Sequence, residues 1–159
     1  MEIRKPVLNK GILKKKTFTN ISVTELEGVF IVGGSLENQN IEDIKIDTSA
    51  LEDISFQSSK VKDIQCIDST LTGANFAGAS FEQTYFERVL ITKSRFQGTQ
   101  FMGCVVRDVM IEKSKCADVS FRFAKIKDVV FLGCDLENAD FMGASMENVV
   151  FKDCSLRNS

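Results

Sequence analysis

An unbroken hydrophobic period of five is the feature that most limits what this chain can fold into. Every fifth residue from Ile21 to Leu156 is hydrophobic, which makes 28 consecutive matches in a sequence that is 43% hydrophobic overall. Ten of the 13 phenylalanines lie in this central column. A period of five drifts around an α-helix of about 3.6 residues per turn, so the pattern excludes an amphipathic helix.

Two flanking columns repeat with the same period. The position two residues before each central residue is nearly always small or β-branched, as in Ala74 and Val89, with Gln39 as the bulky exception. Residues two apart on a strand face the same side, so each unit places one large and one small side chain inward. Two residues after the centre, 20 of the 28 residues are Gly, Asp or Asn, which turn a chain readily. The chain is therefore predicted to be an all-β solenoid with a corner every five residues.

The units also group in twenties, which favours four sides per coil and about seven coils. The column that shows this best is Val89, Val109, Val129 and Val149. We expect residues 1–20, which break the register, to form an N-terminal cap segment, and residues 21–159 to form the repeat domain. The chain stops at Ser159, soon after the central Leu156, so we expect either an exposed last coil or a further C-terminal segment.

Individual units resemble the pentapeptide repeat family, whose consensus is a small residue, Asp or Asn, Leu or Phe, and two variable residues. The matching stretches are Ala-Asn-Phe-Ala-Gly at 74–78, Ala-Ser-Phe-Glu-Gln at 79–83, Cys-Asp-Leu-Glu-Asn at 134–138 and Ala-Asp-Phe-Met-Gly at 139–143. The resemblance covers residues 21–158 and implies a right-handed quadrilateral β-helix. It also implies a candidate function, because the quinolone-resistance members of the family are similar to duplex DNA in width and charge and bind DNA gyrase or topoisomerase. We expect no counterpart here of the C-terminal dimerising helix and loop insertion of those members.

Composition argues against catalysis. The chain has no histidine, which removes the commonest general base, the imidazole metal ligand and the Ser-His and Cys-His nucleophile pairs. The five cysteines occupy inward columns, so we interpret them as buried free thiols. The acidic corner residues are interpreted as turn formers rather than as metal ligands or paired carboxylates. We therefore expect no enzyme activity, no cofactor and no metal site.

Charge is banded along the chain, although the net charge is only −2. Residues 1–20 carry +5, residues 21–70 carry −7, and residues 71–159 are neutral. The predicted acidic band, which is consistent with DNA mimicry, comprises Glu42, Asp43, Asp47, Glu52, Asp53, Asp63 and Asp68. A predicted basic patch, either a solvated face or a surface for an acidic partner, comprises Lys93, Arg95, Lys113 and Lys115. Direct nucleic-acid binding is not expected, because a single Tyr accompanies the basic residues.

One side of the solenoid is expected to be apolar on its outer surface as well. Leu90, Met110, Val130 and Val150 each precede a central residue and therefore point outward, with Leu132 beside them. We expect self-association into a homo-oligomer through this strip, since contiguous exposed apolar surface marks interaction sites. The alternative is a flat surface of β-forming residues that ladder stacking tolerates.

Two functions from different classes follow. The first is a non-enzymatic protein-interaction or structural module, and the second is a DNA mimic that binds gyrase or topoisomerase and confers quinolone protection. No hydrophobic run reaches the roughly 18 residues of a membrane span, and the N-terminus lacks the apolar core of a leader sequence. We therefore expect no membrane partner and a cytoplasmic location.

Overall fold

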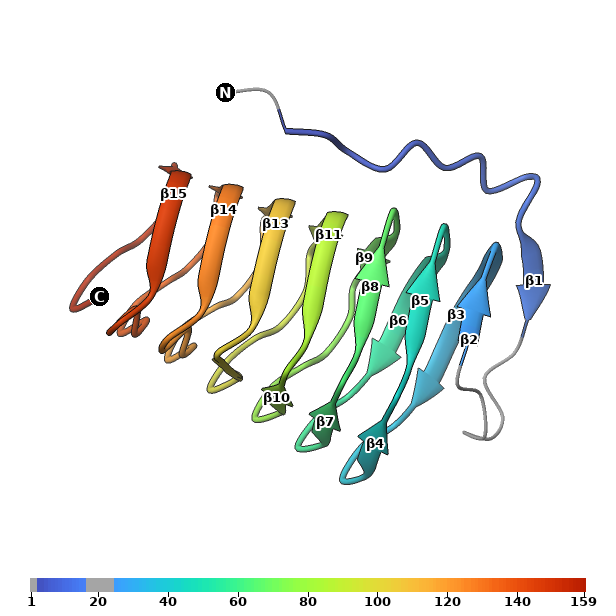
Figure 1. The fold of residues 1–159 in the computed structure, drawn as a ribbon, viewed down its shortest axis with the longest axis horizontal. Coiled ribbons are helices and arrows are strands. Elements are labelled where there is room, and N and C mark those ends of the chain that lie inside the picture. Colours follow the sequence, from blue (N-terminus) through green and yellow to red (C-terminus); the bar gives the residue numbers. More distant parts are fainter. Residues whose placement is uncertain (1–2, 17–24) are drawn as a thin grey trace.

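A computed structural model describes residues 3–16 and 25–159. All regular elements in these ranges are β-strands, and they stack in parallel along a rod whose N-terminal and C-terminal coils lie at opposite ends (Figure 1). No helix in the described ranges is long and apolar enough to cross a membrane. The predicted all-β solenoid is confirmed. The first predicted central residue, Ile21, and the boundary predicted at residue 20 lie outside the described residues.

The strands form two sheets. The larger contains β1 (Lys14–Lys16), β2 (Glu25–Glu27), β3 (Val29–Ser35), β5 (Lys45–Asp47), β6 (Ala50–Ser55), β8 (Gln65–Ile67), β9 (Thr70–Thr72), β11 (Tyr85–Thr92), β13 (Val105–Glu112), β14 (Lys125–Leu132) and β15 (Ser145–Lys152). The smaller contains β4 (Asn40–Glu42), β7 (Lys60–Lys62), β10 (Ser80–Glu82) and β12 (Gln100–Met102).

The strand register gives the solenoid four sides. From β2 onward, paired residues are 20 positions apart, which confirms four five-residue units per coil. We name the sides by the central residues that they carry in steps of 20: side A from Ile41 to Phe141, side B from Leu26 to Met146, side C from Ile31 to Phe151, and side D from Leu36 to Leu156. Side C has seven levels, and the six steps between them correspond to about six turns.

A left-handed backbone bend forms each corner. All 27 corner positions from Gly28 to Asn158 have φ between 47° and 70°. Non-glycine residues rarely adopt such φ values, apart from Asn and Asp. Seven corners nevertheless carry another residue, namely Thr48, Ser58, Gln83, Arg88, Lys93, Lys113 and Phe123. The turn column read from the sequence therefore marks the corners correctly, including those that lack a preferred turn residue.

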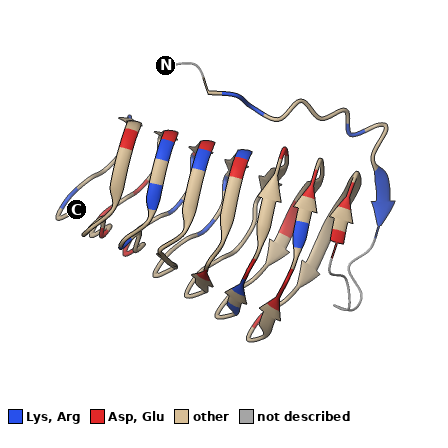
Figure 2. Cartoon of the chain, in the orientation of Figure 1, with Lys and Arg blue, Asp and Glu red and all other residues tan. Residues whose placement is uncertain are grey.

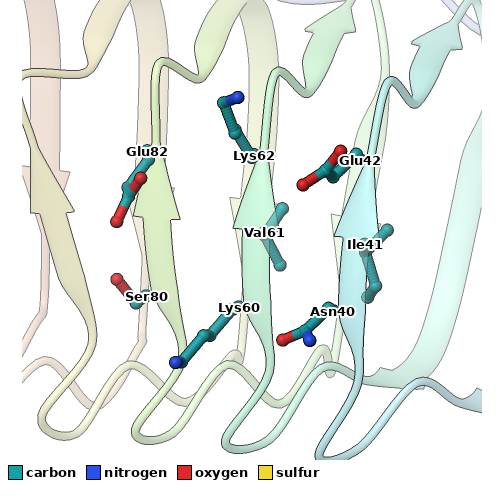
Figure 3. Close-up of a pocket in the computed structure, with 8 residues that line it drawn as sticks. All are labelled: Asn40, Ile41, Glu42, Lys60, Val61, Lys62, Ser80 and Glu82. Carbon is teal, nitrogen blue, oxygen red and sulfur yellow. The ribbon is translucent and has the colours of Figure 1, made fainter.

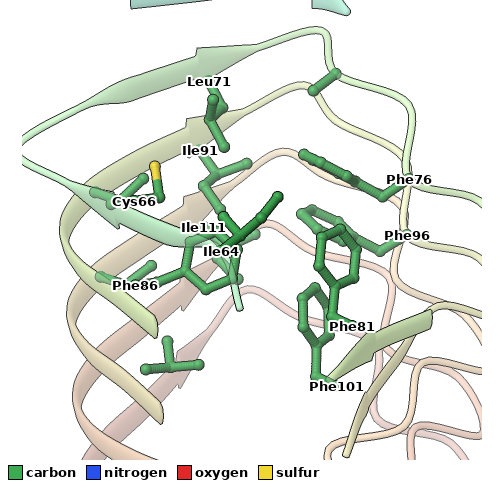
Figure 4. Close-up of a cluster of buried hydrophobic side chains, with 14 of the residues drawn as sticks. Ile64, Cys66, Leu71, Phe76, Phe81, Phe86, Ile91, Phe96, Phe101 and Ile111 are labelled. Atoms are coloured by element: carbon green, nitrogen blue, oxygen red, sulfur yellow. The ribbon is translucent and has the colours of Figure 1, made fainter. Parts of the chain in front are cut away.

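The central column fills the interior with stacked rings and aliphatic side chains. On side A, the Phe101 ring stacks between Phe81 and Phe121, with centroids 4.9 and 5.1 Å apart. A second stack on side D joins Phe76 and Phe96 at 4.9 Å (Figure 4). Among the described central residues, burial decreases only at the C-terminal end, where Met146 and Leu156 of the last coil are 48% and 43% exposed. Gln39, the exception in the small-residue column, is exposed beside β4, the outermost described strand of side A.

A substitution at Gly98 measures the energetic cost of the left-handed backbone conformation alone, without a side-chain clash. Gly98 has a φ of 66°, and a Cβ added there would meet no atom within 4 Å. We expect Gly98→Ala to lower the free energy of unfolding by about 1–2 kcal/mol, because the left-handed bend strains an L-residue. Gly98→Asn should lower the free energy of unfolding by less, since Asn tolerates this conformation. Urea denaturation measures both, and an equal loss in the two variants would contradict this account of the corners.

Candidate interaction surfaces

The predicted apolar strip lies on one face of side C. Leu90, Met110, Val130 and Val150 are consecutive register partners of β11, β13, β14 and β15, and Leu132 lies at the end of β14. Side chains at these positions stand about 4.8 Å apart. Val150 is 40% exposed, and the other four are half-buried. The structure therefore brings the five predicted residues together on the outside of the rod.

The N-terminal segment extends along the same side. β1 pairs with β3 at the N-terminal end of side C, through Lys14 with Val29 and Lys16 with Ile31. Residues 3–13, which we call the arm, then run along the rod toward the C-terminal coils (Figure 1). Within the arm, Ile3 is half-buried, whereas Val7 is 97% exposed. The predicted cap segment thus contributes one strand at the end of the stack and a long covering segment beside it.

Two sets of side-chain contacts position the arm. At its tip, a cleft of about 610 Å³ is lined by Ile3 and Lys5 of the arm together with Met110, Val130, Leu132, Val150 and Lys152 of side C. Nearer to β1, the Lys10 ammonium forms an ion pair with Glu52 and lies 5.3 Å from the centroid of the Phe30 ring. An exposed ion pair contributes about 0.2–1 kcal/mol and an exposed cation–π contact about 0.5–1 kcal/mol. Lys10 therefore attaches the arm to the first coils through two favourable contacts.

A second exposed apolar cluster lies at the corner between sides A and B. Met102, Phe123 and Met142, which we call the Met–Phe patch, are 51%, 61% and 60% exposed. Phe123 occupies a left-handed corner with a φ of 57°, and its ring covers Gly143, where an added Cβ would lie 2.6 Å from a ring carbon. Phe123 is not among the surface residues predicted from the sequence. The signal was present, because Phe123 is an aromatic residue in the turn column.

The four residues of the predicted basic patch lie on two adjacent levels. Lys93 and Lys113 occupy successive corners between sides C and D, and Arg95 and Lys115 are bridge partners on side D. All four side chains are exposed. Lys113 also forms an ion pair with Glu112 at 2.9 Å, which lowers the net charge of the patch.

The acidic band does not form a continuous face. Its seven residues are distributed over sides A, B and C and three corners, and only Asp43 and Asp63 stack at the same corner. Four of the seven have cationic partners: Asp47 with Lys45, Glu52 with Lys10, Asp63 with Lys62 and Asp68 with Arg88. Figure 2 shows acidic residues on several N-terminal strands, with the basic residues of the arm and β1 beside them.

A shallow cleft of about 250 Å³ lies on side A over β4, β7 and β10. Figure 3 shows Lys62 between Glu42 and Glu82, so charges of opposite sign alternate along this cleft. Its other lining residues are Asn40, Ile41, Lys60, Val61 and Ser80. In the described part of the chain, no group of three or more His, Cys, Asp or Glu side chains is placed to hold a metal ion.

Three cysteines make a hydrogen bond to the backbone that serine and threonine make at equivalent positions of other coils. The hydroxyls of Ser49 and Thr99 donate to backbone carbonyls 23 residues earlier, at 3.1 and 2.7 Å. The thiols of Cys104, Cys134 and Cys154 make the same contact at 3.3–3.4 Å. The five cysteines, Cys66, Cys104, Cys116, Cys134 and Cys154, are free. These contacts give three of the five a structural role.

Burial and hydrogen bonding shift the pKa of these thiols in opposite directions. Burial raises the pKa of Cys66 to about 12 and also raises the pKa of Cys104 and Cys154, whereas the hydrogen bond with Cys116 lowers the pKa of the buried Cys134 to about 7. Cys154 lies in the last coil and is partly exposed, whereas the other four are buried. Because the thiolate is the nucleophile, a raised pKa means that reaction is slow at neutral pH and accelerates as pH rises.

We expect iodoacetamide to modify Cys154 first in the native protein. Below the pKa of Cys154, the rate should increase about tenfold per pH unit, in proportion to the thiolate fraction. Mass spectrometry should show one early adduct, which Cys154→Ser removes and the matched Cys104→Ser retains. Equal modification of Cys104 and Cys154 in the folded protein would contradict this ranking.

The chain was compared with known protein families and structures. A family model described as pentapeptide repeats matches residues 69–108 and 114–158 with eight copies, which together are more than half of the chain. No curated protein sequence matches.

Solved structures with the same type of fold are distant. A trypsin-treated form of QnrB1, a plasmid-mediated fluoroquinolone resistance protein, has 15% identity and a TM-score of 0.40 over 79% of this chain and 73% of that chain. A pentapeptide repeat protein from the Arabidopsis thaliana thylakoid lumen has 22% identity and a TM-score of 0.32 over 52% and 58%. HetL from Nostoc sp. PCC 7120, involved in heterocyst differentiation regulation, has 12% identity and a TM-score of 0.29 over 87% and 89%.

Proposed function

Because this chain belongs to the pentapeptide repeat family, whose members are generally structural or interaction modules, we propose that it is a non-enzymatic protein-interaction module. Its first partner is a second copy of the same chain, which binds through the apolar strip of side C. The free, partly reactive thiols favour a reducing compartment, and we place the protein in the cytoplasm.

The apolar strip is the observation that carries this proposal. Four outward residues on consecutive levels, Leu90, Met110, Val130 and Val150, are all apolar. The equivalent outward positions of side A at neighbouring levels are polar, as at Ser80, Gln100, Ser120 and Asp140. A flat apolar strip on a rigid rod suits a twofold interface, in which the same patch of each copy contacts the other.

The position of the arm adds a condition. Ile3 and Lys5 lie against the C-terminal half of the strip, so a second copy reaches those residues only when the tip of the arm leaves them. The N-terminal part of the strip, at Leu90, is outside this cleft. Association is therefore expected to be concentration-dependent rather than permanent.

The double variant Leu90→Lys with Val130→Lys tests this interface. Placing two ammonium groups in an apolar contact leaves charges without partners, which disrupts association. Light scattering after size exclusion, over a range of concentrations, should show a dimer for the natural chain and a monomer for the variant. The control is Ser80→Lys with Ser120→Lys, at equivalent outward positions on side A, which should dimerise normally. A dimer that survives in the strip variant would rule out this surface.

DNA mimicry that acts on gyrase or topoisomerase is the second candidate. The feature in its favour is the charge of −7 over residues 21–70. The distribution of those carboxylates over several sides, and the ion pairs of four of them, weaken the resemblance to a phosphate backbone. We rank this function second for that reason.

A supercoiling assay with purified gyrase separates the two functions. Under DNA mimicry, the protein inhibits supercoiling or restores it in the presence of a quinolone, and neutralising Asp43 and Asp63 together with Asn weakens the effect. We expect no effect on the enzyme at a molar excess of protein. Inhibition that depends on these two carboxylates would reverse the ranking.

A further inference from the structure

We infer that the arm is a strap that acts within its own chain, and that it competes with a second copy of the protein for the side C strip. The inference rests on the proposed self-association and adds a means of controlling it. It differs from the predicted cap, because the arm covers a lateral surface and not the end of the stack.

The tip of the arm and the apolar strip share residues. Ile3 contributes the apolar side chain from the arm, opposite Met110, Val130 and Val150. These three belong to the set that forms the proposed dimer surface. Arm and partner therefore cannot occupy the C-terminal half of the strip at the same time.

Charge favours the closed position of the arm. Residues 3–16 contain six basic and no acidic side chains, whereas residues 25–70 contain ten acidic and three basic ones. Lys10 makes the direct contact, since its ammonium pairs with Glu52 and lies over the Phe30 ring. Both side chains of the pair are partly exposed, at 47% and 28%, so salt screens their attraction.

The arm can leave without disturbing the strand ladder. Among the described residues, backbone hydrogen bonds from the N-terminal segment to the solenoid begin at Lys14, whose N–H donates to the carbonyl of Gly28 at 2.9 Å. Upstream of β1, the backbone bonds of the arm are internal: Ile12 N–H donates to the carbonyl of Asn9, and Gly11 N–H donates to the Asn9 side chain. The turn at residues 9–12 therefore separates a fixed base in β1 from a tip held by side chains alone.

This arrangement allows the arm to control the access of a second copy to the strip. With Lys10 on Glu52, the tip lies over Met110, Val130 and Val150, and the strip is partly withdrawn from partners. When the Lys10 contact is lost, the tip leaves, and the full strip becomes available to a second copy. Conditions that weaken the ion pair, such as high ionic strength, should therefore favour the dimer.

Cross-linking of Lys5 to Lys152 measures the closed arm directly, because both lysines line the cleft at the tip. The full-length protein is treated with bis(sulfosuccinimidyl) suberate, the monomer is isolated, and the Lys5–Lys152 peptide pair is quantified by mass spectrometry. We expect Lys10→Glu to reduce the yield about three- to tenfold, since it removes an ion pair and a cation–π contact and adds repulsion from Glu52. The charge-swapped variant Lys10→Glu with Glu52→Lys should restore most of the yield.

A second pair of variants tests the apolar tip independently of charge. Ile3→Ser should reduce the same cross-link, whereas Val7→Ser, which alters a fully exposed arm residue, should leave it unchanged. A cross-link yield unaffected by both Lys10→Glu and Ile3→Ser would overturn the strap.

Light scattering on the same samples separates the strap from the dimer interface. If both proposals hold, Lys10→Glu lowers the dimer dissociation constant about three- to tenfold, in parallel with the loss of the cross-link. If the cross-link decreases but every variant stays monomeric, the strap stands and self-association through the strip is wrong. If the dimer strengthens with no change in the cross-link, the competition is wrong.

Discussion

The left-handed bend at every fifth residue is the constraint on which the rest of the structure depends. It turns the chain through four sides in 20 residues and so places residues 20 apart on top of one another. An ordinary L-residue in this conformation is strained by about 1–2 kcal/mol, and seven corners accept that strain. Stacked central residues such as Phe81, Phe101 and Phe121, together with the parallel backbone ladder, compensate for it.

This architecture confines function to the outer surface. Two residues of each unit fill the interior, and even three of the five cysteines there make the backbone contacts that serine and threonine make elsewhere. The outward positions are free to vary, but register places equivalent side chains about 4.8 Å apart in straight rows. A chemical character repeated on successive levels, as at Met110, Val130 and Val150, therefore becomes a continuous surface. That is why we propose recognition rather than catalysis for this protein.

The solenoid was predictable from the sequence because each local signal reports the same geometry. The central column, the small column and the turn column all repeat every five residues, so the register could be read without long-range information. The apolar strip followed from that register. The arm did not, because residues 3–13 lie outside the repeat, and their position depends on distant contacts such as Lys10 with Glu52. The register places Phe123 at a corner, but the exposure of its ring did not follow from the repeat, because the turn column is otherwise free of aromatic residues.

The charge bands show a further limit of linear sequence reading. The net charge of residues 21–70 is the sum over all four sides of the solenoid, whereas a binding partner contacts only one side. Adjacent members of the band, such as Asp43 and Asp47, point from different parts of the perimeter, and nearby lysines of the same coil, such as Lys45 and Lys62, pair with some of them. Position within the 20-residue coil, which can be read from the sequence, already separates these charges onto different sides.

The path of the arm also affects how the whole solenoid is expected to unfold. In a stack where each coil touches only its neighbours, the two ends fray separately. Here one segment touches the first coils through Phe30 and Glu52 and the last coils through Val130 and Val150. These contacts couple the two ends of the solenoid. Unfolding of either end therefore destabilises the other, and thermal unfolding becomes more cooperative.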